Sequence, residues 1–466
     1  MAARDLILRN VEVEGRGGLD VRLADGRIAE VGPRLAACGQ ELDGRGGALI
    51  PGLIDHHIHL LAAAAKADSL ALDDVAGAAD LAVRLTAFAA ARPPGTWIRA
   101  VGYHEAIVGL PGRAELDALV PAHPLRIQHR TGGLWLLNSL ALARLGEAAA
   151  PEGLERDAAG APTGRLWRGD SWLSDRLGRT PPPLAPLGRT LAAAGVTGLM
   201  DASVTTNPAA AALLAEAVRS GALPQRLGLM SGGALAAPHD GAIFVGPLKI
   251  LLDDHALPDL AEIVARIGEA RGQGRAVAVH CVAAGELAVT LAAFEAEGAQ
   301  AGDRIEHGGL ISSAAVAAVA AMGLTVVTQP AFIFERGDRY LAEVDPAEHG
   351  DLYRCASLLA AGVPVAASSD APYASPDPWI GVAAAVDRLT RAGRPIGLAE
   401  RVTPRRALDL YLGPFDRPGG PSRRIAPGQA ADLCLLKAPE AEALDQPGAE
   451  LVAATLVGGE VTFEAG

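Results

Sequence analysis

The sequence predicts an α/β protein with a (β/α)₈ TIM barrel, a small β-sandwich domain formed from both termini, and a long insertion after the first barrel strand. Short apolar strands alternate with alanine-rich helical stretches through the middle of the chain, which is the repeat of a parallel barrel. Both ends of the chain read instead as alternating β-strands. We therefore expect residues 1–52 and 418–466 to form the sandwich and residues 53–417 the barrel, with residues 61–190 as an inserted, cap-like subdomain.

The terminal strands are indicated by alternation and by turn residues. Residues 6–13 and 19–23 alternate between apolar and polar side chains, and residues 28–32 continue after an Asp-Gly turn. Near the other end, residues 431–436 are an apolar strand and residues 455–463 a hairpin centred on two glycines.

Eight short apolar segments are expected to form the barrel, because parallel strands are buried on both faces. They are residues 51–59, 196–201, 226–230, 247–252, 276–280, 304–307, 324–328 and 363–367. Helices are expected at residues 257–271, 285–297, 312–322, 352–361 and 378–392.

Residues 61–190 do not fit this repeat, since they are far too long for one strand-to-helix connection. They hold helices of their own at 75–91 and 114–120, and strands at 97–102 and 125–129. Barrel active sites lie at the C-terminal ends of the strands, where this insertion would emerge. We expect it to cap the site and shape its specificity.

Polar side chains close several of the barrel strands. Residues i and i+2 of a strand point to one face, so a His-x-His strand end can direct both imidazoles to one point. In a barrel all C-terminal strand ends converge, so we expect six groups to share a centre. Nitrogen and oxygen donors of this kind suit Zn²⁺, with Mn²⁺ or Fe²⁺ as alternatives. The six are His57, His59, Lys249, His280, His307 and Asp370.

Each of these residues also has a plainer reading when it is taken alone. His57 and His59 could be buried histidines bonded to the backbone, Lys249 a salt-bridged lysine, and Asp370 a turn or helix-capping aspartate. Glu306 precedes a candidate ligand and should point to the opposite side of its strand, so we expect a structural role for it.

The order of these motifs resembles the amidohydrolase superfamily and, within it, amidohydrolase family 3. The resemblance extends over nearly the whole chain. It rests on Pro51-Gly-Leu-Ile-Asp-His-His-Ile-His, Leu248-Lys-Ile, Arg304-Ile-Glu-His, Ser369-Asp-Ala-Pro and Pro427-Gly-Gln-Ala-Ala-Asp-Leu.

The resemblance implies a centre with two Zn²⁺ ions per chain. His57, His59 and Asp370 would hold one ion, and His280 and His307 the other. Lys249, carboxylated by CO₂, would bridge them, since a lysine ammonium has no lone pair with which to bind a metal. A one-metal site is the alternative.

The implied activity is metal-dependent hydrolysis of a C–N bond, such as an amide or lactam, in a small molecule. A metal-activated hydroxide would attack, and Asp370 would act as general base and then as general acid. Ester or lactone hydrolysis, decarboxylation and isomerisation are alternative reactions at the same centre. A barrel that has lost catalysis and serves as a scaffold is a further alternative.

Candidate substrate-binding residues follow strands of the insertion or of the barrel. An arginine could pair with a substrate carboxylate, although a structural ion pair is the alternative, and the two tryptophans could instead pack the insertion. The candidates are His104, Arg130, Trp135, Trp167 and Gln329.

Composition excludes several classes of partner. The formal net charge of −13 argues against nucleic acid and against an anionic membrane surface. The N-terminus has no signal-peptide pattern, and charges interrupt every alanine-rich stretch before it could span a membrane. The four cysteines, Cys38, Cys281, Cys355 and Cys434, are far apart in the sequence and are expected to be reduced thiols of a cytoplasmic protein. The resemblance alone suggests a homo-oligomer.

Overall fold

The chain folds into two compact units, one made of Met1–Leu60 with Leu187–Gly466 and the other of Leu61–Pro186. Each unit has its own sheets and its own buried apolar clusters. The computed structural model describes residues 5–37, 39–146, 150–177, 181–236 and 241–466.

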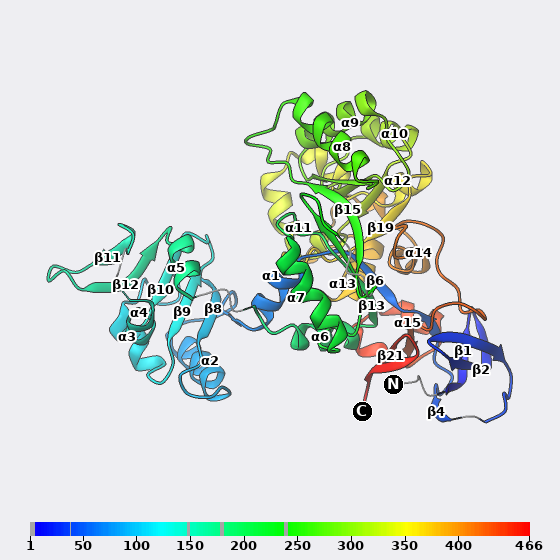
Figure 1. Cartoon of the computed structure of the whole chain (residues 1–466), viewed down its shortest axis with the longest axis horizontal. Helices are drawn as coiled ribbons and strands as arrows, with labels where there is room; N and C mark the ends of the chain where they lie inside the picture. The colour runs from blue at the N-terminus through cyan, green and yellow to red at the C-terminus, as the bar shows by residue number, and fades with distance from the viewer. Residues whose placement is uncertain (1–4, 38, 147–149, 178–180, 237–240) are drawn as a thin grey trace. The chain divides into compact units, whose positions relative to one another are not determined.

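The first unit contains the predicted parallel barrel sheet (Figure 1). The two end strands of this sheet come together, because the N–H of Asp370 donates to the His57 carbonyl at 2.8 Å. The predicted eight-stranded parallel barrel sheet is therefore confirmed and is nearly closed. In spatial order its strands are β19 (Val365–Ala367), β18 (Thr325–Thr328), β17 (Arg304–His307), β16 (Val277–Cys281), β15 (Phe244–Ile250), β14 (Arg226–Ser231), β13 (Val196–Asp201) and β6 (Leu53–Ile58).

Helices connect the barrel strands, and several helices of this unit differ from the expectation: α12 is shorter than expected, and α6, α7, α14 and α15 were not predicted from the sequence. The sequence did not predict α11, and α13 ends at Asp387 because Arg388 has a left-handed backbone with φ of 54°. The helices are α6 (Ala185–Ala193), α7 (Pro208–Arg219), α8 (Leu260–Gly272), α9 (Ala284–Glu297), α10 (Ser313–Ala321), α11 (Ala331–Glu343), α12 (Ala356–Ala360), α13 (Pro378–Asp387), α14 (Pro404–Asp409) and α15 (Glu440–Asp445).

Both ends of the chain contribute small sheets to the same unit. The first has the order β3-β2-β1-β4 and the second β22-β21-β20-β5. Leu8 and Val21 of the first sheet belong to the same buried cluster as Leu433 and Leu456 of the second. A sandwich geometry for these sheets stays a prediction. Their bounds are β1 (Leu6–Val13), β2 (Arg16–Ala24), β3 (Arg27–Gly32), β4 (Gln40–Asp43), β5 (Leu49–Pro51), β20 (Leu433–Leu436), β21 (Val452–Val457) and β22 (Glu460–Glu464).

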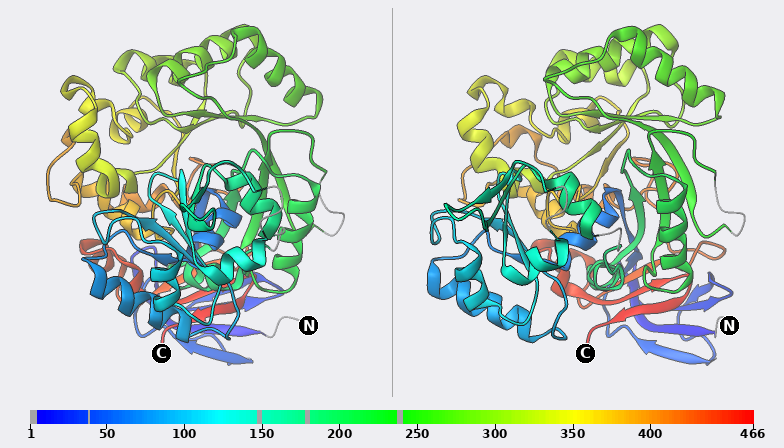
Figure 2. Two further views of the ribbon diagram at one scale, coloured as in Figure 1. Left: turned by 90° about the vertical axis from the view of Figure 1, so that its left-hand side faces the viewer. Right: turned by 60° about the vertical axis from the view of Figure 1, so that its left-hand side comes forward.

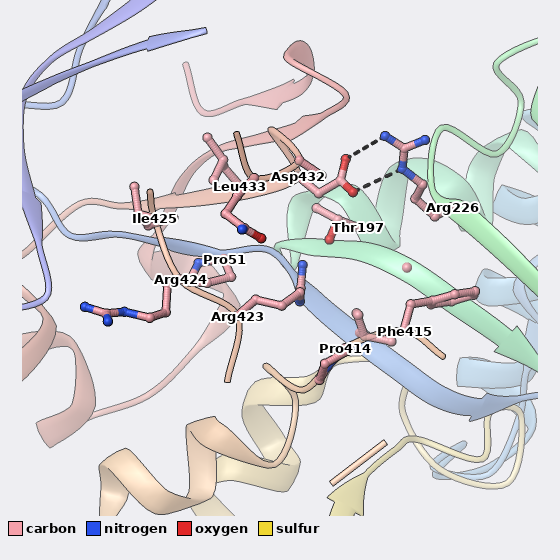
Figure 3. Close-up of a pocket in the computed structure, with 14 residues that line it drawn as sticks. Pro51, Thr197, Arg226, Pro414, Phe415, Arg423, Arg424, Ile425, Asp432 and Leu433 are labelled. Atoms are coloured by element: carbon pink, nitrogen blue, oxygen red, sulfur yellow. Dashed lines mark hydrogen bonds and ion pairs between the residues drawn. The ribbon is translucent and has the colours of Figure 1, made fainter. Parts of the chain in front are cut away.

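A cavity of about 340 Å³ lies where β20 meets the starts of β6, β13 and β14 (Figure 3). Arg226 at the start of β14 forms an ion pair with Asp432, with 3.0 Å between Nε and Oδ2. Arg423 donates to the carbonyls of Leu412 and Gly413. The ion pair joins the second small sheet to the N-terminal ends of the barrel strands, the end opposite to the predicted site.

The second unit is built on a six-stranded mixed sheet with helices packed on it (Figure 2). β7, β8 and β9 are parallel, while β10, β11 and β12 pair antiparallel. In spatial order the strands are β11 (Leu154–Arg156), β12 (Pro162–Trp167), β10 (Leu134–Leu137), β9 (Leu125–His129), β8 (Ile98–Tyr103) and β7 (Leu70–Ala71). Its helices are α2 (Ala78–Ala90), α3 (Arg113–Leu119), α4 (Ser139–Leu145) and α5 (Asp170–Leu177), and α1 (Leu60–Ala67) leads into it.

The cysteines of the described residues are buried free thiols: Cys281, Cys355 and Cys434. Cys38 lies outside the described residues. Within the ranges that the structure describes, every helix is too short or too polar to cross a membrane.

Candidate metal centre

His57, His59 and Asp370 come together at the C-terminal end of the barrel. Their ligand atoms all lie within 4.8 Å of one another. The Oδ1 atom of Asp370 is 3.4 Å from Nε2 of His57 and 3.2 Å from Nε2 of His59. The first and last strands of the barrel therefore supply two imidazoles and one carboxylate to a single point.

Two further histidines extend this cluster. The ring centroids of His57 and His307 are 4.7 Å apart, and those of His307 and His280 are 4.5 Å apart. The backbones of His307 and Asp370 are left-handed, with φ of 68° and 53°. This conformation is strained for residues other than glycine, and such strain is concentrated at functional sites.

Lys249 lies beside the histidines. Its side chain is buried, and burial lowers the pKa of the ammonium group to about 8. Burial, followed by the charge of Lys249, lowers the pKa of His57 well below its usual range and that of His280 to about 4. These two imidazoles are therefore neutral at pH 7, which is the form that binds a metal.

Three buried polar atoms of this cluster have no hydrogen-bond partner among the described residues: His57 Nε2, Asp370 Oδ1 and Lys249 Nζ. An unpaired polar atom in the interior costs free energy, so native structures rarely keep one without a reason. Two of the three are a nitrogen lone pair and a carboxylate oxygen that face each other. A cation between them would satisfy both, so this donor set fits a metal ion.

Glu306 fixes the orientation of His57. Its Oε2 atom is hydrogen-bonded to His57 Nδ1, and its Oε1 atom accepts from Arg304 Nε. Burial opposes ionisation of Glu306, but the charges of Arg304 and Lys249 hold its pKa well below the usual range. A carboxylate at Nδ1 can only accept a hydrogen bond, so the proton of His57 is on Nδ1 and the lone pair of Nε2 is free to bind a metal. The expectation that Glu306 faces away from the site is wrong.

Two neutral side chains contact the Nδ1 atoms of two other histidines and fix the orientation of their rings. Ser203 Oγ is 3.1 Å from His59 Nδ1, and Gln329 Oε1 is 2.8 Å from His307 Nδ1. Gln329 donates through Nε2 to Ser368 Oγ at 2.9 Å, which leaves its carbonyl oxygen facing His307. In both cases Nε2 is the nitrogen left for a metal.

Sequence reasoning also assigned no role to Asp55 and Asp201, although each is a buried carboxylate in a barrel strand. Asp55 accepts the N–H groups of His57 and Ser369, at 3.2 and 3.1 Å, and burial raises its pKa to about 6. Asp201 accepts the N–H of Leu60 at 2.8 Å. Both carboxylates hold backbone that carries ligands.

The remaining candidate substrate residues lie in the second unit, and their role in binding stays a prediction. The ring of His104 stacks on His129 with centroids 6.1 Å apart, and Arg130 is exposed. Trp135 is buried in the apolar cluster of β10 and α4, whereas Trp167 on β12 is 45% exposed. Gln329 belongs to the barrel, where it is fully buried against His307.

Comparison with known proteins adds a family to this geometry. The model of the amidohydrolase family matches residues 40–463. The N-substituted formamide deformylase of Arthrobacter pascens is 28% identical, over 93% of this chain and 93% of its own.

Two solved structures share the fold. An uncharacterised metal-dependent hydrolase from Pyrococcus horikoshii has a TM-score of 0.74 at 20% identity, over 93% of this chain and 97% of its own. An N-isopropylammelide isopropylaminohydrolase from Burkholderia multivorans has a TM-score of 0.54 at 19% identity, over 100% of this chain and 99% of its own.

Proposed function

This chain belongs to the amidohydrolase family and is a metal-dependent hydrolase, and from that premise we propose that it cleaves a C–N bond of a small molecule. The class of bond that we favour is an N-substituted amide. The deformylase to which the chain is similar over nearly its whole length acts, by its name, on N-substituted formamides.

The observation that carries the proposal is the meeting of His57, His59 and Asp370 around unpaired buried atoms. We assign these three residues to one Zn²⁺ ion and His280 and His307 to a second. Lys249, as its CO₂ adduct, would bridge the two, and Mn²⁺ or Fe²⁺ are the alternatives. When bound, the metal acidifies water and polarises the substrate carbonyl.

Asp370 is the group we assign to proton transfer. Its Oδ1 atom faces the Nε2 atoms of His57 and His59, and its Oδ2 atom is 3.8 Å from His307 Nδ1. In the proposed reaction it takes a proton from the attacking water and gives it to the leaving amine. Glu306, Ser203 and Gln329 hold three imidazoles in the orientation that this geometry requires.

An activity screen with the Asp370→Asn variant tests the proposal. Zinc-loaded protein is assayed against N-substituted formamides, N-acyl amino acids, lactams, cyclic imides and esters. We expect turnover of an amide substrate, its loss by at least a thousandfold in Asp370→Asn at saturating zinc, and retained folding by circular dichroism. Asp74→Asn is the control, because this exposed carboxylate pairs with Arg84 on the surface of the second unit. Full activity in Asp370→Asn would refute the assignment, and turnover of esters alone would refute the C–N specificity.

A further inference from the structure

Two arginines stand side by side on one face of the sheet in the second unit. β8 and β9 are parallel, and their register places Arg99 directly opposite Arg126. Like charges that face each other across neighbouring strands destabilise a sheet. A negative charge close to both guanidinium groups would therefore stabilise this arrangement.

The protein supplies no such charge among the described residues. Arg99 donates to the Ala65 carbonyl at 3.1 Å, to Ser69 Oγ at 3.1 Å and to Gln128 Oε1 at 3.2 Å, all of them neutral acceptors. Arg126 has no ion pair there and no hydrogen bond, and its Nε atom is buried without a partner. Burial and the charge of Arg99 lower the pKa of Arg126 to about 10, so it is still a cation at pH 7.

Both arginines line a cavity of about 660 Å³ within this unit. Tryptophans flank Arg126, whose guanidinium carbon lies 5.9 Å from the ring centre of Trp97 and 5.8 Å from that of Trp135. Leu173, Leu177 and Pro182 are among the other apolar residues that line the cavity.

One carboxylate, Asp68, also lines the cavity. It forms an ion pair with Arg92 at 3.3 Å, and its side chain is half exposed. It therefore offsets the charge of Arg92 and leaves Arg99 and Arg126 uncompensated. The cavity combines two cationic donors with an aromatic and aliphatic wall.

We propose that this cavity binds a small organic carboxylate, with the carboxylate between Arg99 and Arg126 and an apolar body against Trp97 and Trp135. An arginine fork matches the two oxygens of a carboxylate, and its charge is stabilised further when an anion replaces water in a partly desolvated site. The apolar wall favours an organic acid over a bare inorganic anion. This site goes beyond the proposed hydrolase activity, because none of its residues belongs to the metal centre.

Calorimetric titration of the full-length protein with benzoate tests the proposal. Two control compounds are titrated in parallel. Inorganic phosphate has the negative charge of benzoate but no apolar body, and benzyl alcohol has the apolar body but no charge. We expect benzoate to bind at least tenfold more tightly than either. If benzyl alcohol bound as tightly as benzoate, the arginines would not contribute to binding, and the proposal would be wrong. If phosphate bound as tightly as benzoate, the site would not be specific for an organic carboxylate, and the proposal would also be wrong.

The variant Arg126→Met separates this site from any binding of benzoate at the metal centre. We expect its affinity for benzoate to fall at least tenfold, while Arg84→Met, which removes a surface arginine of the same unit paired with Asp74 and Asp80, stays within twofold of the wild type. The melting temperature of ligand-free Arg126→Met should equal or exceed that of the wild type, because an unpaired buried cation is removed. Unchanged benzoate affinity would overturn the proposal. If Arg126→Met does not fold, Arg126→Lys carries the same test, since lysine keeps the charge and loses the fork, and it too should bind benzoate several-fold more weakly.

Discussion

Replacing Glu306 by glutamine should weaken metal binding without touching a metal ligand. Glu306 and His57 are almost completely buried, with exposed side-chain fractions of 0% and 1%. Glutamine keeps an oxygen that can accept from His57 Nδ1, but it removes the charge that makes the imidazole a stronger donor to a metal. Loss of such an outer partner typically lowers metal affinity 10–100-fold, or about 1.4–2.7 kcal/mol.

The same substitution should also destabilise the metal-free protein. The guanidinium group of Arg304 is buried beside Glu306 and otherwise donates to the His56 carbonyl, at 2.8 Å. Removing one partner of a buried ion pair costs about 3–5 kcal/mol, because the remaining charge is left uncompensated. Because the single oxygen of glutamine accepts from His57, its NH2 group would face the Nε–H of Arg304, so we expect a loss that reaches the upper part of that range.

Two assays measure these effects. Competition with a chromophoric chelator gives the zinc affinity, and urea unfolding of the metal-free protein gives the free energy of unfolding. Glu343→Gln is the matched control, because Glu343 pairs with Arg339 on the surface of α11 and should change neither quantity by more than about 0.5 kcal/mol. If Glu306→Gln binds zinc within threefold of the wild type, Glu306 does not tune His57, and the reasoning fails.

Four further changes have defined outcomes. Ser203→Ala removes a neutral hydrogen bond to His59 and should weaken zinc binding by about 1 kcal/mol, which is less than the loss expected for Glu306→Gln. If chelator competition gave a larger loss for Ser203→Ala than for Glu306→Gln, the hydrogen bond of Ser203 would matter more than that of Glu306. Lys249→Met should lower the zinc content from about two ions per chain to about one. The content is measured by mass spectrometry after loading with zinc and bicarbonate. Two ions per chain in the variant would exclude a bridging lysine. Removing the metal by dialysis against a chelator should lower the melting temperature, because a ligand present at a thousand times its Kd stabilises the folded state by about 4 kcal/mol. Calorimetric scans with and without zinc measure this difference. Identical melting temperatures would show that the centre binds no zinc. Gly195→Ala should lower the free energy of unfolding by at least about 2 kcal/mol in urea titrations. Gly195 has φ of 82°, and a Cβ there would lie 2.7 Å from Cys434 Sγ. An unchanged free energy of unfolding would contradict the packing at the start of β13.

The sequence predicts the barrel strands and the positions of the candidate ligands at their ends, because both depend on periodicity. Each barrel strand is a short apolar segment, and the ligands stand where those segments end, so His57 and Asp370 could be placed on one face without knowledge of any contact. Glu306 was missed because that argument assumes a regular extended backbone. His307 departs from it, with φ of 68°, and this lets both Glu306 and His307 approach His57.

Other elements escaped prediction because their signals are weak or depend on tertiary contacts. Helix α11 contains Gly337 in its interior, a residue that disfavours helices, yet a Cβ at this position would lie 2.6 Å from the Thr390 side chain. The need for glycine there comes from a residue more than fifty positions away. Strands β10, β11 and β12 are short and lie among turns, so their pairing could not be inferred from alternation alone.

The hydrogen bond that joins the two ends of the barrel sheet has a consequence for how the protein folds. Beside the bond from Asp370 to the His57 carbonyl, the N–H of Ser369 donates to Asp55, which is 314 positions away in the chain. Contacts between such distant residues carry a large loop-closure entropy and tend to form late. Because His57 and Asp370 flank the same seam, we expect the proposed zinc ion to bind at full affinity only after the last strand has docked on the first. Zinc uptake during refolding would therefore report the completion of the barrel.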